Sequence, residues 1–472
     1  MARLTPGKKG EVPVHRFPRL LIAGTHSGAG KTTIATALMA MLSGAGLRVQ
    51  PYKVGPDYID PGFHRVATGR ISRNLDAFFL GEAGVEEIFT RSAHDADISV
   101  IEGVMGFYDG IGSGDAGSSA RVAELLRCPV LLVVDARSMA ASAAAVVWGF
   151  ANLPGGVPLA GVILNRVAGP RHLALLKEAI ESRTGVPVVG GVPRESEMEM
   201  PERHLGLVPS EETGAVRRLV EKLAGRVAPH LSLEKMVGLA GSAPAIGARE
   251  YIFAVEPGEP VRLGLVRDRA FNFYYQDGLD LLQALGAEMV YCSAVEDRAL
   301  PPDLDGLYIG GGFPEMFLPE VSGNRSFIES IRRRADMGMP LFAECGGLMY
   351  LCRGISDFQG REWPGAAILP ARCRMENKRV ALGYVTATAL RDNVLVPAGT
   401  ALRGHEFHYS SVSGELVPAY CLDKPGRDEG RRDGHAAGNV LATYLHIHFA
   451  GAPGAARGFL RSCAAFRRLR MA

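Results

Sequence analysis

Residues 19–33 have the sequence RLLIAGTHSGAGKTT, in which a short, mostly apolar run leads into a glycine-rich loop and then into a helical pattern. The run RLLIAG (19–24) predicts a buried strand, and GKTTIATALMAMLSGAG (30–46) predicts a helix that ends on glycine. The backbone N–H groups of such a loop, with the helix dipole behind them, can cradle phosphate oxygens. The stretch therefore predicts the opening unit of an α/β domain with a phosphate site.

Two side chains of this loop predict contacts with a nucleotide. Lys31 would reach the terminal phosphates, and the hydroxyl of Thr32 would bind Mg²⁺. The loop departs from the usual pattern at Thr25, which stands where the first glycine is expected. A glycine-rich turn without a ligand is the alternative, but the order of strand, loop and helix favours nucleotide binding.

Three more apolar runs follow in the first half: ISVIEG (98–103), PVLLVVDA (129–136) and LAGVILNRV (159–167). Continuous runs of this kind are typical of parallel strands that are covered on both faces. Helical patterns separate them, so we predict a doubly wound α/β domain over residues 19–231.

Acidic residues lie at the carboxyl ends of two predicted strands: a second strand that ends just before KVGPDYIDP, and the run 98–103. Asp57 and Asp60 lie in KVGPDYIDP, and Glu102 and Asp109 lie in IEGVMGFYDG. The carboxyl ends of strands in an open parallel sheet converge on the ligand crevice, where carboxylates can hold Mg²⁺. Either cluster alone is equally compatible with a turn of solvated acids. Together with the glycine-rich loop, the two clusters favour a metal–nucleotide site.

Asn165 ends the predicted strand GVILN. Its amide could pair with an adenine edge, or it could cap a turn, and the sequence leaves both alternatives open.

The second half contains another α/β series. VRLGLVRD, AEMVYCSA, GLYIGGG, MPLFAECGG and NVLATYLHIHF predict its strands, so a second mostly parallel, doubly wound sheet is expected. The whole chain then divides into a flexible basic leader (1–18), the first domain (19–231), a Gly-, Ala- and Pro-rich linker (232–260), the second domain (261–450) and a C-terminal tail (451–472).

Cys345 lies in MPLFAECGGLMY, between an apolar run and a helix-like run. This arrangement resembles a nucleophile elbow, and the helix N-terminus behind the thiol would lower its pKa. Upstream, GLYIGGG predicts a strand that ends in glycines. The backbone N–H groups of Gly311, Gly312 and Gly346 are predicted to form an oxyanion hole.

A reactive thiol needs a histidine to take up and return protons. The candidates are His405, His408, His446 and His448. A buried core thiol is the alternative for Cys345, but the glycine strand before it and the histidine strand after it favour catalysis. The remaining cysteines have no such surroundings and are expected to be structural: Cys128, Cys292, Cys352, Cys373, Cys421 and Cys463.

Composition narrows the class of protein. The 472 residues are 47% hydrophobic and 22% charged, with a net charge of +2, so nothing favours a nucleic-acid or membrane partner. The cysteines form no CxxC pair, and the N-terminus lacks the apolar stretch of a signal peptide. No window approaches the roughly 20 apolar residues of a membrane span. A cytoplasmic protein with reduced thiols is therefore expected.

Taken together, these segments resemble the cobyrinic acid a,c-diamide synthase family, whose members are glutamine-dependent amidoligases of corrin biosynthesis. The resemblance runs from about residue 19 to about residue 450. The family pairs a dethiobiotin-synthetase-like ATP domain with a class I glutamine amidotransferase domain. Its most specific segments here are GTHSGAGKTT, YKVGPDYIDPGFH, IEGVMGFYDG, PVLLVVDARSMAASAAA, GVILNRV, PERHLGLVP, GGGFPE, AECGGLMYL, RGHEFHYS and ATYLHIHF.

The resemblance implies roles for individual residues. The ATP-binding set would be Thr25, Gly28, Gly30, Lys31, Thr32, Thr33, Lys53 and Asn165. Mg²⁺ would be held by Thr32, Asp57 and Glu102, and the substrate carboxylate would lie near Tyr58, Asp60 and Asp109. Cys345 would attack the amide carbon of glutamine with His446 as its base, which leaves structural or interface roles for His405 and His408.

The resemblance also carries a departure from ordinary class I amidotransferases. These place a glutamate two residues after the catalytic histidine, and that position is His448 here. The cobyrinate branch shares this feature, so Cys345 and His446 would act as a dyad unless a partner for His446 comes from elsewhere.

The implied reaction is amidation of the a and c acetate carboxylates of cobyrinic or hydrogenobyrinic acid, through an acyl phosphate and ammonia released at Cys345. The small-molecule partners would be the tetrapyrrole, glutamine and ATP, with Mg²⁺; a homodimer is an open possibility. Siroheme amidases and nickel-sirohydrochlorin diamide synthases look similar over the same motifs and remain alternatives. A P-loop partitioning or switch ATPase is a more remote one, because it leaves AECGG after GGGFPE unexplained.

Overall fold

The computed structural model describes residues 14–112, 114–153, 157–194, 213–247, 250–426 and 430–472. The chain divides into two compact units, Met1–Tyr251 and Ile252–Ala472. Residues 1–13 of the predicted leader and the segment PERHLGLVP lie outside the described residues.

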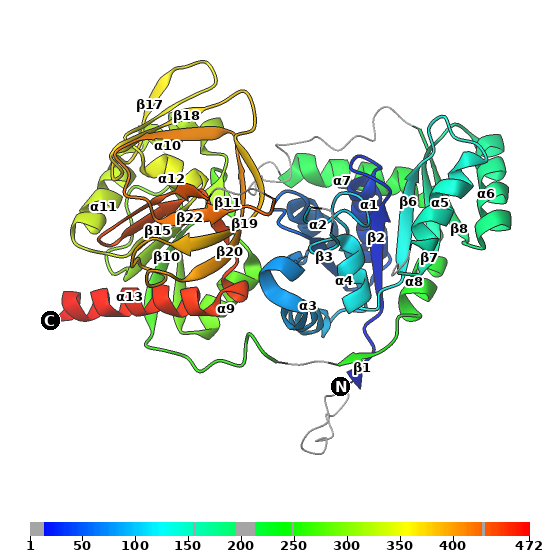
Figure 1. Ribbon diagram of the computed structural model, residues 1–472, viewed down its shortest axis with the longest axis horizontal. Coiled ribbons are helices and arrows are strands. Elements are labelled where there is room, and N and C mark those ends of the chain that lie inside the picture. The colour runs from blue at the N-terminus through cyan, green and yellow to red at the C-terminus, as the bar shows by residue number, and fades with distance from the viewer. Residues whose placement is uncertain (1–13, 113, 154–156, 195–212, 248–249, 427–429) are drawn as a thin grey trace. The chain divides into compact units, whose positions relative to one another are not determined.

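The first unit is built on a seven-stranded sheet of order β4-β3-β5-β2-β6-β7-β8 (Figure 1). Every neighbouring pair in this sheet is parallel. The strands are β2 (Arg19–Gly24), β3 (Val49–Val54), β4 (Arg73–Leu75), β5 (Ile98–Glu102), β6 (Val130–Asp135), β7 (Leu159–Val167) and β8 (Val188–Pro193). Strands β2, β3, β5 and β6 are buried along their whole length, which confirms the fold predicted from continuous apolar runs.

Helices cover this sheet (Figure 1). They are α1 (Lys31–Gly44), α2 (Asp60–Thr68), α3 (Ala77–Ala93), α4 (Ser119–Leu125), α5 (Ser142–Asn152), α6 (Pro170–Thr184), α7 (Thr213–Val227) and α8 (Leu233–Gly241). Leu38 of α1, Phe63 of α2, Leu223 of α7 and Met236 of α8 share one hydrophobic core with Leu20 of β2. Each such buried side chain stabilises the fold by about 1.5–3 kcal/mol.

The predicted linker over residues 232–260 is partly wrong. Its first part is helix α8, which Ser232 caps by accepting a hydrogen bond from Lys235 N–H. Met236 and Ala240 of α8 are buried in the core of the first unit, and the short strand β9 (Ile246–Gly247) pairs with β1 (Val14–His15). The helix was missed because its short apolar pattern is diluted by glycine and alanine.

The second unit has a six-stranded sheet of order β12-β10-β13-β15-β25-β24. The first five strands are parallel, and β24 is antiparallel to β25. Their bounds are β10 (Val261–Val266), β12 (Ala287–Cys292), β13 (Gly306–Ile309), β15 (Leu341–Glu344), β24 (His435–Ala437) and β25 (Val440–Thr443). The prediction of a second, mostly parallel sheet is confirmed.

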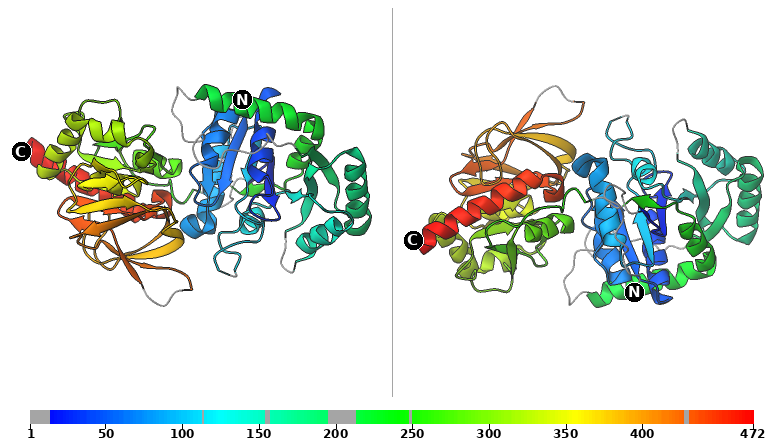
Figure 2. Two further views of the ribbon diagram at one scale, coloured as in Figure 1. Left: turned by 90° about the horizontal axis from the view of Figure 1, so that it is seen from above. Right: turned by 90° about the horizontal axis from the view of Figure 1, so that it is seen from below.

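The predicted C-terminal tail is the last helix of this unit. Helix α13 (Pro453–Met471) lies along the second unit in both views of Figure 2. Phe459, Cys463 and Phe466 of α13 are buried, while Arg457 and Arg461 point to solvent. The other helices of the unit are α9 (Gln276–Ala284), α10 (Leu318–Gly323), α11 (Arg325–Asp336) and α12 (Gly346–Leu351).

The sequence did not predict two further sheets. One has the order β23-β22-β19-β20-β26, and the other has the order β17-β16-β18-β21. Their strands are β16 (Gly354–Ser356), β17 (Glu362–Pro364), β18 (Ala371–Met375), β19 (Ala381–Ala389), β20 (Ala401–His408), β21 (Ser410–Gly414), β22 (Tyr420–Asp423), β23 (Arg431–Asp433) and β26 (His446–Ile447). The predicted strand 439–449 is thus divided between β25 and β26, and this division pairs His446 with His405 of β20.

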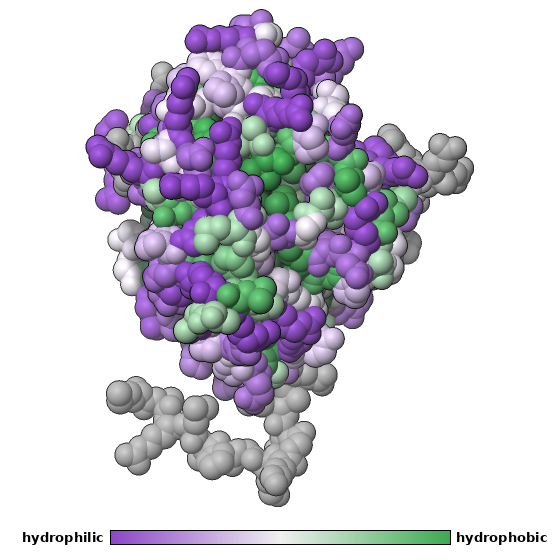
Figure 3. All heavy atoms as spheres, turned by 90° about the vertical axis from the view of Figure 1, so that its left-hand side faces the viewer, coloured by the Kyte–Doolittle hydropathy of each residue, from purple (hydrophilic) through white to green (hydrophobic). Residues whose placement is uncertain are grey.

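A mixed surface covers the second unit. Figure 3 shows hydrophobic side chains near the centre of one face and hydrophilic side chains around them. A groove of about 680 Å³ in this unit is lined by apolar residues that include Pro340, Phe466 and Leu469. The homodimer remains a prediction. Within the described ranges, no helix combines the length and the apolar character that a membrane crossing requires.

Candidate active sites

The predicted phosphate loop joins β2 to α1. Gly28 and Gly30 have φ angles of 85° and 101°, in the left-handed region that glycine adopts without strain. A Cβ on Gly30 would lie 2.1 Å from the side-chain nitrogen of Asn165. The loop therefore requires glycine at position 30 both for its backbone conformation and for the approach of Asn165.

Lys31 begins α1, and its side chain folds back over Gly24. The ammonium group donates a hydrogen bond to the carbonyl of His26 at 3.2 Å. Burial, followed by the charge of Lys53, lowers the pKa of Lys31 to about 8. Thr25 lies at the start of the loop, where its hydroxyl is 2.9 Å from Nδ1 of His26, and Thr33 lies in the first turn of α1.

Thr32, Lys53 and Glu102 come together from α1 and the ends of β3 and β5. The Thr32 hydroxyl donates to Glu102 Oε1 at 2.6 Å, and the Lys53 ammonium lies 2.8 Å from the same oxygen. Lys53 is also 2.6 Å from Asp60 Oδ2. Parallel strands that end at one edge of the sheet bring these groups together, as the sequence predicted.

The opposite charges of this cluster stabilise one another and shift the pKa values of its members. Burial alone would lower the pKa of Lys53, but the charges of Asp60, Glu102 and Asp57 raise it. Burial would likewise raise the pKa of Glu102, but Lys53 and a hydrogen bond from His64 keep it well below its usual range. Glu102 is therefore a carboxylate at neutral pH although it is fully buried.

The two aspartates of the Asp57–Asp60 segment occupy different places. Asp57 Oδ1 accepts the backbone N–H groups of Ile59 and Asp60, and its other oxygen is 3.9 Å from the Lys53 ammonium. Asp60 Oδ2 lies 3.4 Å from the Thr32 hydroxyl. Asp60, predicted near the substrate, thus contacts Thr32 and lies closer to Lys53 than Asp57 does.

The donor set of this cluster suits a hard cation. It consists of a hydroxyl and carboxylate oxygens, the ligands that Mg²⁺ takes in proteins. In the described part of the chain, no three His, Cys, Asp or Glu side chains form a metal-binding group on their own. The predicted Mg²⁺ ligands include the Thr32 hydroxyl, and phosphate oxygens of the nucleotide would complete the coordination. The contact between Thr32 and Glu102 is the observation that supports this ligand set.

Tyr58 and Asp109 lie in loops near these groups. Asp109 is exposed, and its Oδ2 accepts a hydrogen bond from Gly106 N–H at 2.8 Å. Its charge raises the pKa of Lys31, against the larger opposing effect of burial. Tyr58 is half-buried in the loop before α2.

Asn165 holds the phosphate loop. Its side-chain nitrogen donates to the carbonyl of Ala29 at 2.9 Å, and its side-chain oxygen accepts from Arg166 N–H at 2.9 Å. Both ends of the buried amide are therefore engaged by backbone, which favours the structural alternative over the pairing with adenine.

Replacing Asn165 by alanine is expected to weaken ATP and GTP binding by the same factor. The carbonyl of Ala29 loses its donor, which destabilises the loop by about 1 kcal/mol. Calorimetric titration with both nucleotides measures the effect. A loss confined to ATP would show that Asn165 recognises adenine instead.

Cys345 lies at a sharp turn between β15 and α12. Its φ and ψ are 48° and −104°, and its N–H donates to the carbonyl of Thr443 at 2.7 Å. A Cβ on Gly347 would lie 2.4 Å from the carbonyl of Ile309, so the turn leaves no space for a side chain there. A non-glycine residue in such a backbone conformation is typical of a nucleophile elbow.

The expected low pKa of this thiol is wrong for the described structure. Burial raises the pKa of Cys345, and the charge of Glu315 adds to the increase. The hydrogen bond from Gly346 N–H opposes this shift without overcoming it. Helix α12 has only six residues. Cys345 is therefore a protonated thiol at neutral pH and requires a base.

The predicted oxyanion glycines lie beside the thiol turn. A Cβ on Gly346 would lie 3.1 Å from the backbone nitrogen of Gly312, and one on Gly311 would lie 2.5 Å from Cε1 of His446. The backbones at Gly312 and Gly346 therefore approach closely, and His446 faces Gly311.

The four candidate histidines have different surroundings. His446 is 1% exposed and lies opposite His405 in the β20–β26 pair. The ring of His408 stacks on Tyr444 with centroids 3.7 Å apart. His446 is the candidate next to the predicted oxyanion glycines. Burial, followed by the charges of His405 and His408, lowers its pKa to about 3, so its imidazole is neutral.

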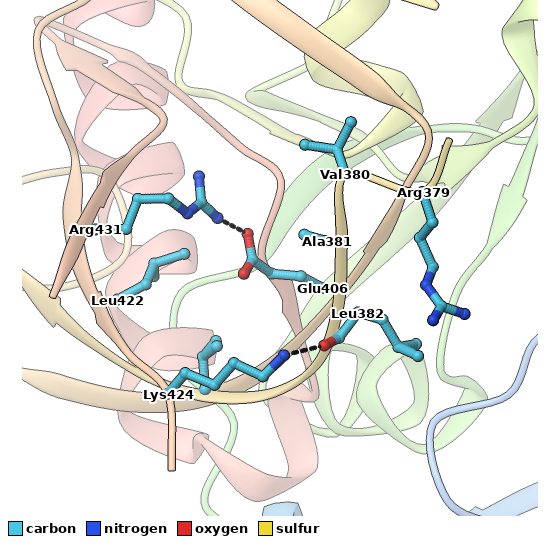
Figure 4. A pocket seen from close by; sticks show the side chains of 9 residues that line it. Arg379, Val380, Ala381, Leu382, Glu406, Leu422, Lys424 and Arg431 are labelled. Carbon is cyan, nitrogen blue, oxygen red and sulfur yellow. Dashed lines mark hydrogen bonds and ion pairs between the residues drawn. The ribbon is translucent and has the colours of Figure 1, made fainter. Parts of the chain in front are cut away.

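A separate pocket of about 400 Å³ lies on the antiparallel sheet of the second unit (Figure 4). In it, Glu406 points towards Arg431 and forms an ion pair, and Lys424 donates to the carbonyl of Leu382. The ion pair with Arg431 thus holds the Glu406 carboxylate at the wall of this pocket.

Two family models match the chain. Residues 20–208 match the CobQ/CobB/MinD/ParA nucleotide binding domain, and residues 262–454 match the CobB/CobQ-like glutamine amidotransferase domain. The cobyrinate a,c-diamide synthase of Caldanaerobacter subterraneus subsp. tengcongensis is 43% identical over 95% of this chain and 99% of its own length. The chain belongs to the cobyrinate a,c-diamide synthase family.

Two other relatives in this family have similar identities. The cobyrinate a,c-diamide synthase of Methanothermobacter thermautotrophicus is 44% identical over 94% of this chain and 99% of its own length. The hydrogenobyrinate a,c-diamide synthase of Streptomyces coelicolor is 44% identical over 94% and 97%. With its nucleotide-binding domain and its amidotransferase domain, the chain is a glutamine-dependent amide ligase.

Sequence reasoning missed His64 in the first site of this synthase-family chain. Its Nε2 is 2.6 Å from Glu102 Oε2, and its Nδ1 is 3.0 Å from the Ser72 hydroxyl. His64 ends the segment YKVGPDYIDPGFH, but its place on α2, four residues after Asp60, is what turns it towards Glu102.

Proposed function

We propose that the protein amidates the a and c acetate carboxylates of cobyrinic acid or its metal-free counterpart, hydrogenobyrinic acid. ATP would activate each carboxylate as an acyl phosphate, and ammonia released from glutamine at Cys345 would displace the phosphate. The contact of Thr32, Lys53 and Glu102 at the phosphate loop is the observation that carries the ATP half of this proposal.

Activation is required because a carboxylate is a poor electrophile at neutral pH. The γ-phosphoryl group of ATP passes to a carboxylate oxygen, and the resulting acyl phosphate has a good leaving group. Lys31 would hold the terminal phosphates, since its ammonium lies at the loop that the backbone N–H groups line. Lys53 would offset the growing charge.

Mg²⁺, when bound, would neutralise the phosphate charge. Thr32 and Glu102, with Asp57 or Asp60 nearby, are the residues that would hold it. Lys53 and Thr32 both contact Glu102 Oε1. For Mg²⁺ to bind this oxygen, the two side chains would have to share it with the metal or move away from it.

Glutamine would be cleaved at the second site. The Cys345 sulfur attacks the amide carbon while His446 takes the thiol proton and passes it to the departing nitrogen, which leaves as ammonia. Water then hydrolyses the thioester and releases glutamate. Gly311, Gly312 and Gly346 would donate N–H groups to the oxyanion, because their backbones lie beside the turn.

The choice of ring rests on the relatives. Cobyrinate or hydrogenobyrinate appears in the names of the three relatives described above, with identities of 43–44% over nearly the whole chain. These names favour the corrin reaction over the siroheme and nickel-sirohydrochlorin alternatives.

Product mass tests the proposal. The protein is incubated with ATP, Mg²⁺, glutamine and one ring at a time: cobyrinic acid, hydrogenobyrinic acid, siroheme or nickel-sirohydrochlorin. Two amides on a corrin ring are expected, at the a and c positions. Amidation of siroheme or nickel-sirohydrochlorin instead would overturn the choice of ring.

The pH dependence of ATP binding is expected to report Lys31. Its pKa of about 8 means that the free ammonium loses its proton as the pH rises above 8, so ATP affinity falls by up to about tenfold per pH unit there. Lys31→Arg keeps its charge and should bind ATP with constant affinity between pH 8 and 10. Calorimetric dissociation constants measure both; a flat wild-type profile would contradict the expectation.

A further inference from the structure

The position that ordinary class I amidotransferases give to a glutamate is His448 here, and His448 has a different surrounding. Its ring stacks on Tyr275, with centroids 4.5 Å apart and planes inclined by 19°. Position 448 therefore supplies no carboxylate for His446.

A carboxylate reaches His446 from another strand. Glu344 is the last residue of β15, directly before Cys345. Its Oε2 lies 3.9 Å from Nδ1 of His446, and both side chains are 1% exposed. An acid and an imidazole are thus adjacent in the buried interior of the second unit.

Two hydrogen bonds fix the orientation of Glu344. Its Oε1 accepts from Ile447 N–H at 2.7 Å, and its Oε2 accepts from the Tyr308 hydroxyl at 2.7 Å. Ile447 directly follows His446 on β26, so the carboxylate is tied to the backbone that carries the histidine. A side chain held in this way is positioned in advance of the reaction.

We propose that Glu344 is the positioning residue of His446. It would take the role that the glutamate two residues after the catalytic histidine has in ordinary class I amidotransferases. The inference rests on the proposed glutaminase function of Cys345. Glu344 would orient the imidazole with its Nδ1–H towards the carboxylate and its Nε2 towards the thiol. When His446 takes the thiol proton, the carboxylate stabilises the imidazolium.

Other charged and titratable groups also act at this site. They are His405, Glu406 and His408 on β20, Glu315 after β14 (Gly311–Gly312), Cys345 on the turn, and Tyr274 and Tyr308 beside Glu344. Glu406 is paired with Arg431 in the pocket of Figure 4. The two histidines of β20 disfavour an imidazolium at His446 and the charge of Glu406 favours it, so the Glu344 carboxylate would add to the favourable charge.

The protonation of Glu344 gives the site a pH dependence. Burial raises the pKa of Glu344 to about 8, against hydrogen bonds from Tyr308 and Ile447. The carboxylate form therefore increases as the pH rises through 8, and the glutaminase rate increases with it.

Glu344→Gln tests the inference, because glutamine keeps the size of the side chain. Its carbonyl oxygen can accept from Ile447 N–H, while its NH2 group can donate to the Tyr308 hydroxyl oxygen in place of the bond that the carboxylate accepts. The kcat of glutamine hydrolysis is expected to fall about 10²-fold or more, with KM changed by less than about threefold. The increase in rate near pH 8 should disappear. Glu344→Asp should recover at least about tenfold over the glutamine variant.

Asp433→Asn is the matched control. Asp433 is a second buried carboxylate of this unit, and it likewise accepts from a hydroxyl, that of Thr443, and from a backbone N–H, that of Tyr444. Its amide variant is expected to retain glutaminase activity within about threefold. Ammonium-dependent amidation should persist in both variants because it uses the first unit, and a KM for glutamine close to the wild-type value shows that the second unit keeps its fold.

Three outcomes would overturn the inference. They are a Glu344→Gln enzyme with wild-type rate and pH profile, an equal loss in Asp433→Asn, and a loss of ammonium-dependent amidation along with glutamine hydrolysis. A wild-type enzyme that does not hydrolyse glutamine would overturn the proposed function, and this inference with it.

Discussion

Replacing Cys345 by alanine is expected to reduce glutamine-dependent amidation at least about 10³-fold, because no other group can form the thioester. Amidation with ammonium should stay within about threefold of the wild-type rate, since the ATP site lies on the other unit. Both rates are measured as amide formed on the corrin ring. Loss of both activities would contradict two separable sites.

Cys352→Ala is the control for this variant. Cys352 follows the last residue of α12, is fully buried and donates to the carbonyl of Leu348 at 3.4 Å. Its replacement leaves a small cavity and is expected to cost about 1 kcal/mol of stability with little change in either rate. An equal loss in this variant would mean that packing, and not the thiol of Cys345, supports glutamine use.

Replacing Glu102 by glutamine is expected to reduce amidation about 10³-fold with glutamine and with ammonium alike. The variant loses the charge that Lys53 and His64 contact, and with it the carboxylate proposed for Mg²⁺. Removing one partner of a buried charge cluster should also destabilise the first unit by about 3 kcal/mol. Steady-state rates and denaturant unfolding measure the two effects.

Asp97→Asn is the control for Glu102→Gln, because it also removes one carboxylate charge, just before the other end of β5. Asp97 directly precedes β5, at the end opposite Glu102, and its surface pair with Arg48 is exposed. Surface pairs contribute about 0–1 kcal/mol, so this variant should keep both activities. If Glu102→Gln remained active with ammonium, the proposed role of Glu102 in the ATP reaction would be wrong.

The fold of the first unit could be predicted because its signals are local. The strand at Arg19–Gly24, the glycines of the loop and the helix from Lys31 are contiguous, and each apolar run corresponds to one buried strand. The two smaller sheets of the second unit, β23-β22-β19-β20-β26 and β17-β16-β18-β21, gave no such signal. Strands β16, β17 and β23 have three residues each, and the predicted strand 439–449 is divided between β25 and β26.

The sites could be predicted where residue types define the chemistry. Lys31, Thr32 and Cys345 each lie in a short sequence motif that indicates a chemical role. Asn165 could be interpreted in two ways from the sequence, and only the structure shows that its amide binds backbone groups. Contacts between residues far apart in the sequence could not be predicted, because they depend on the fold. Glu344 and Ile447 bond across 103 positions of the chain, and no spacing rule connects them.

The acyl phosphate is the proposed step that couples ATP to the amide, and transfer of ¹⁸O tests it most directly. The ring is supplied with ¹⁸O in its carboxylates, together with ATP, Mg²⁺ and glutamine, and inorganic phosphate is analysed by mass spectrometry. The account predicts one ¹⁸O atom in phosphate for each amide formed. Unlabelled phosphate with full amide yield, or label in AMP, would contradict it.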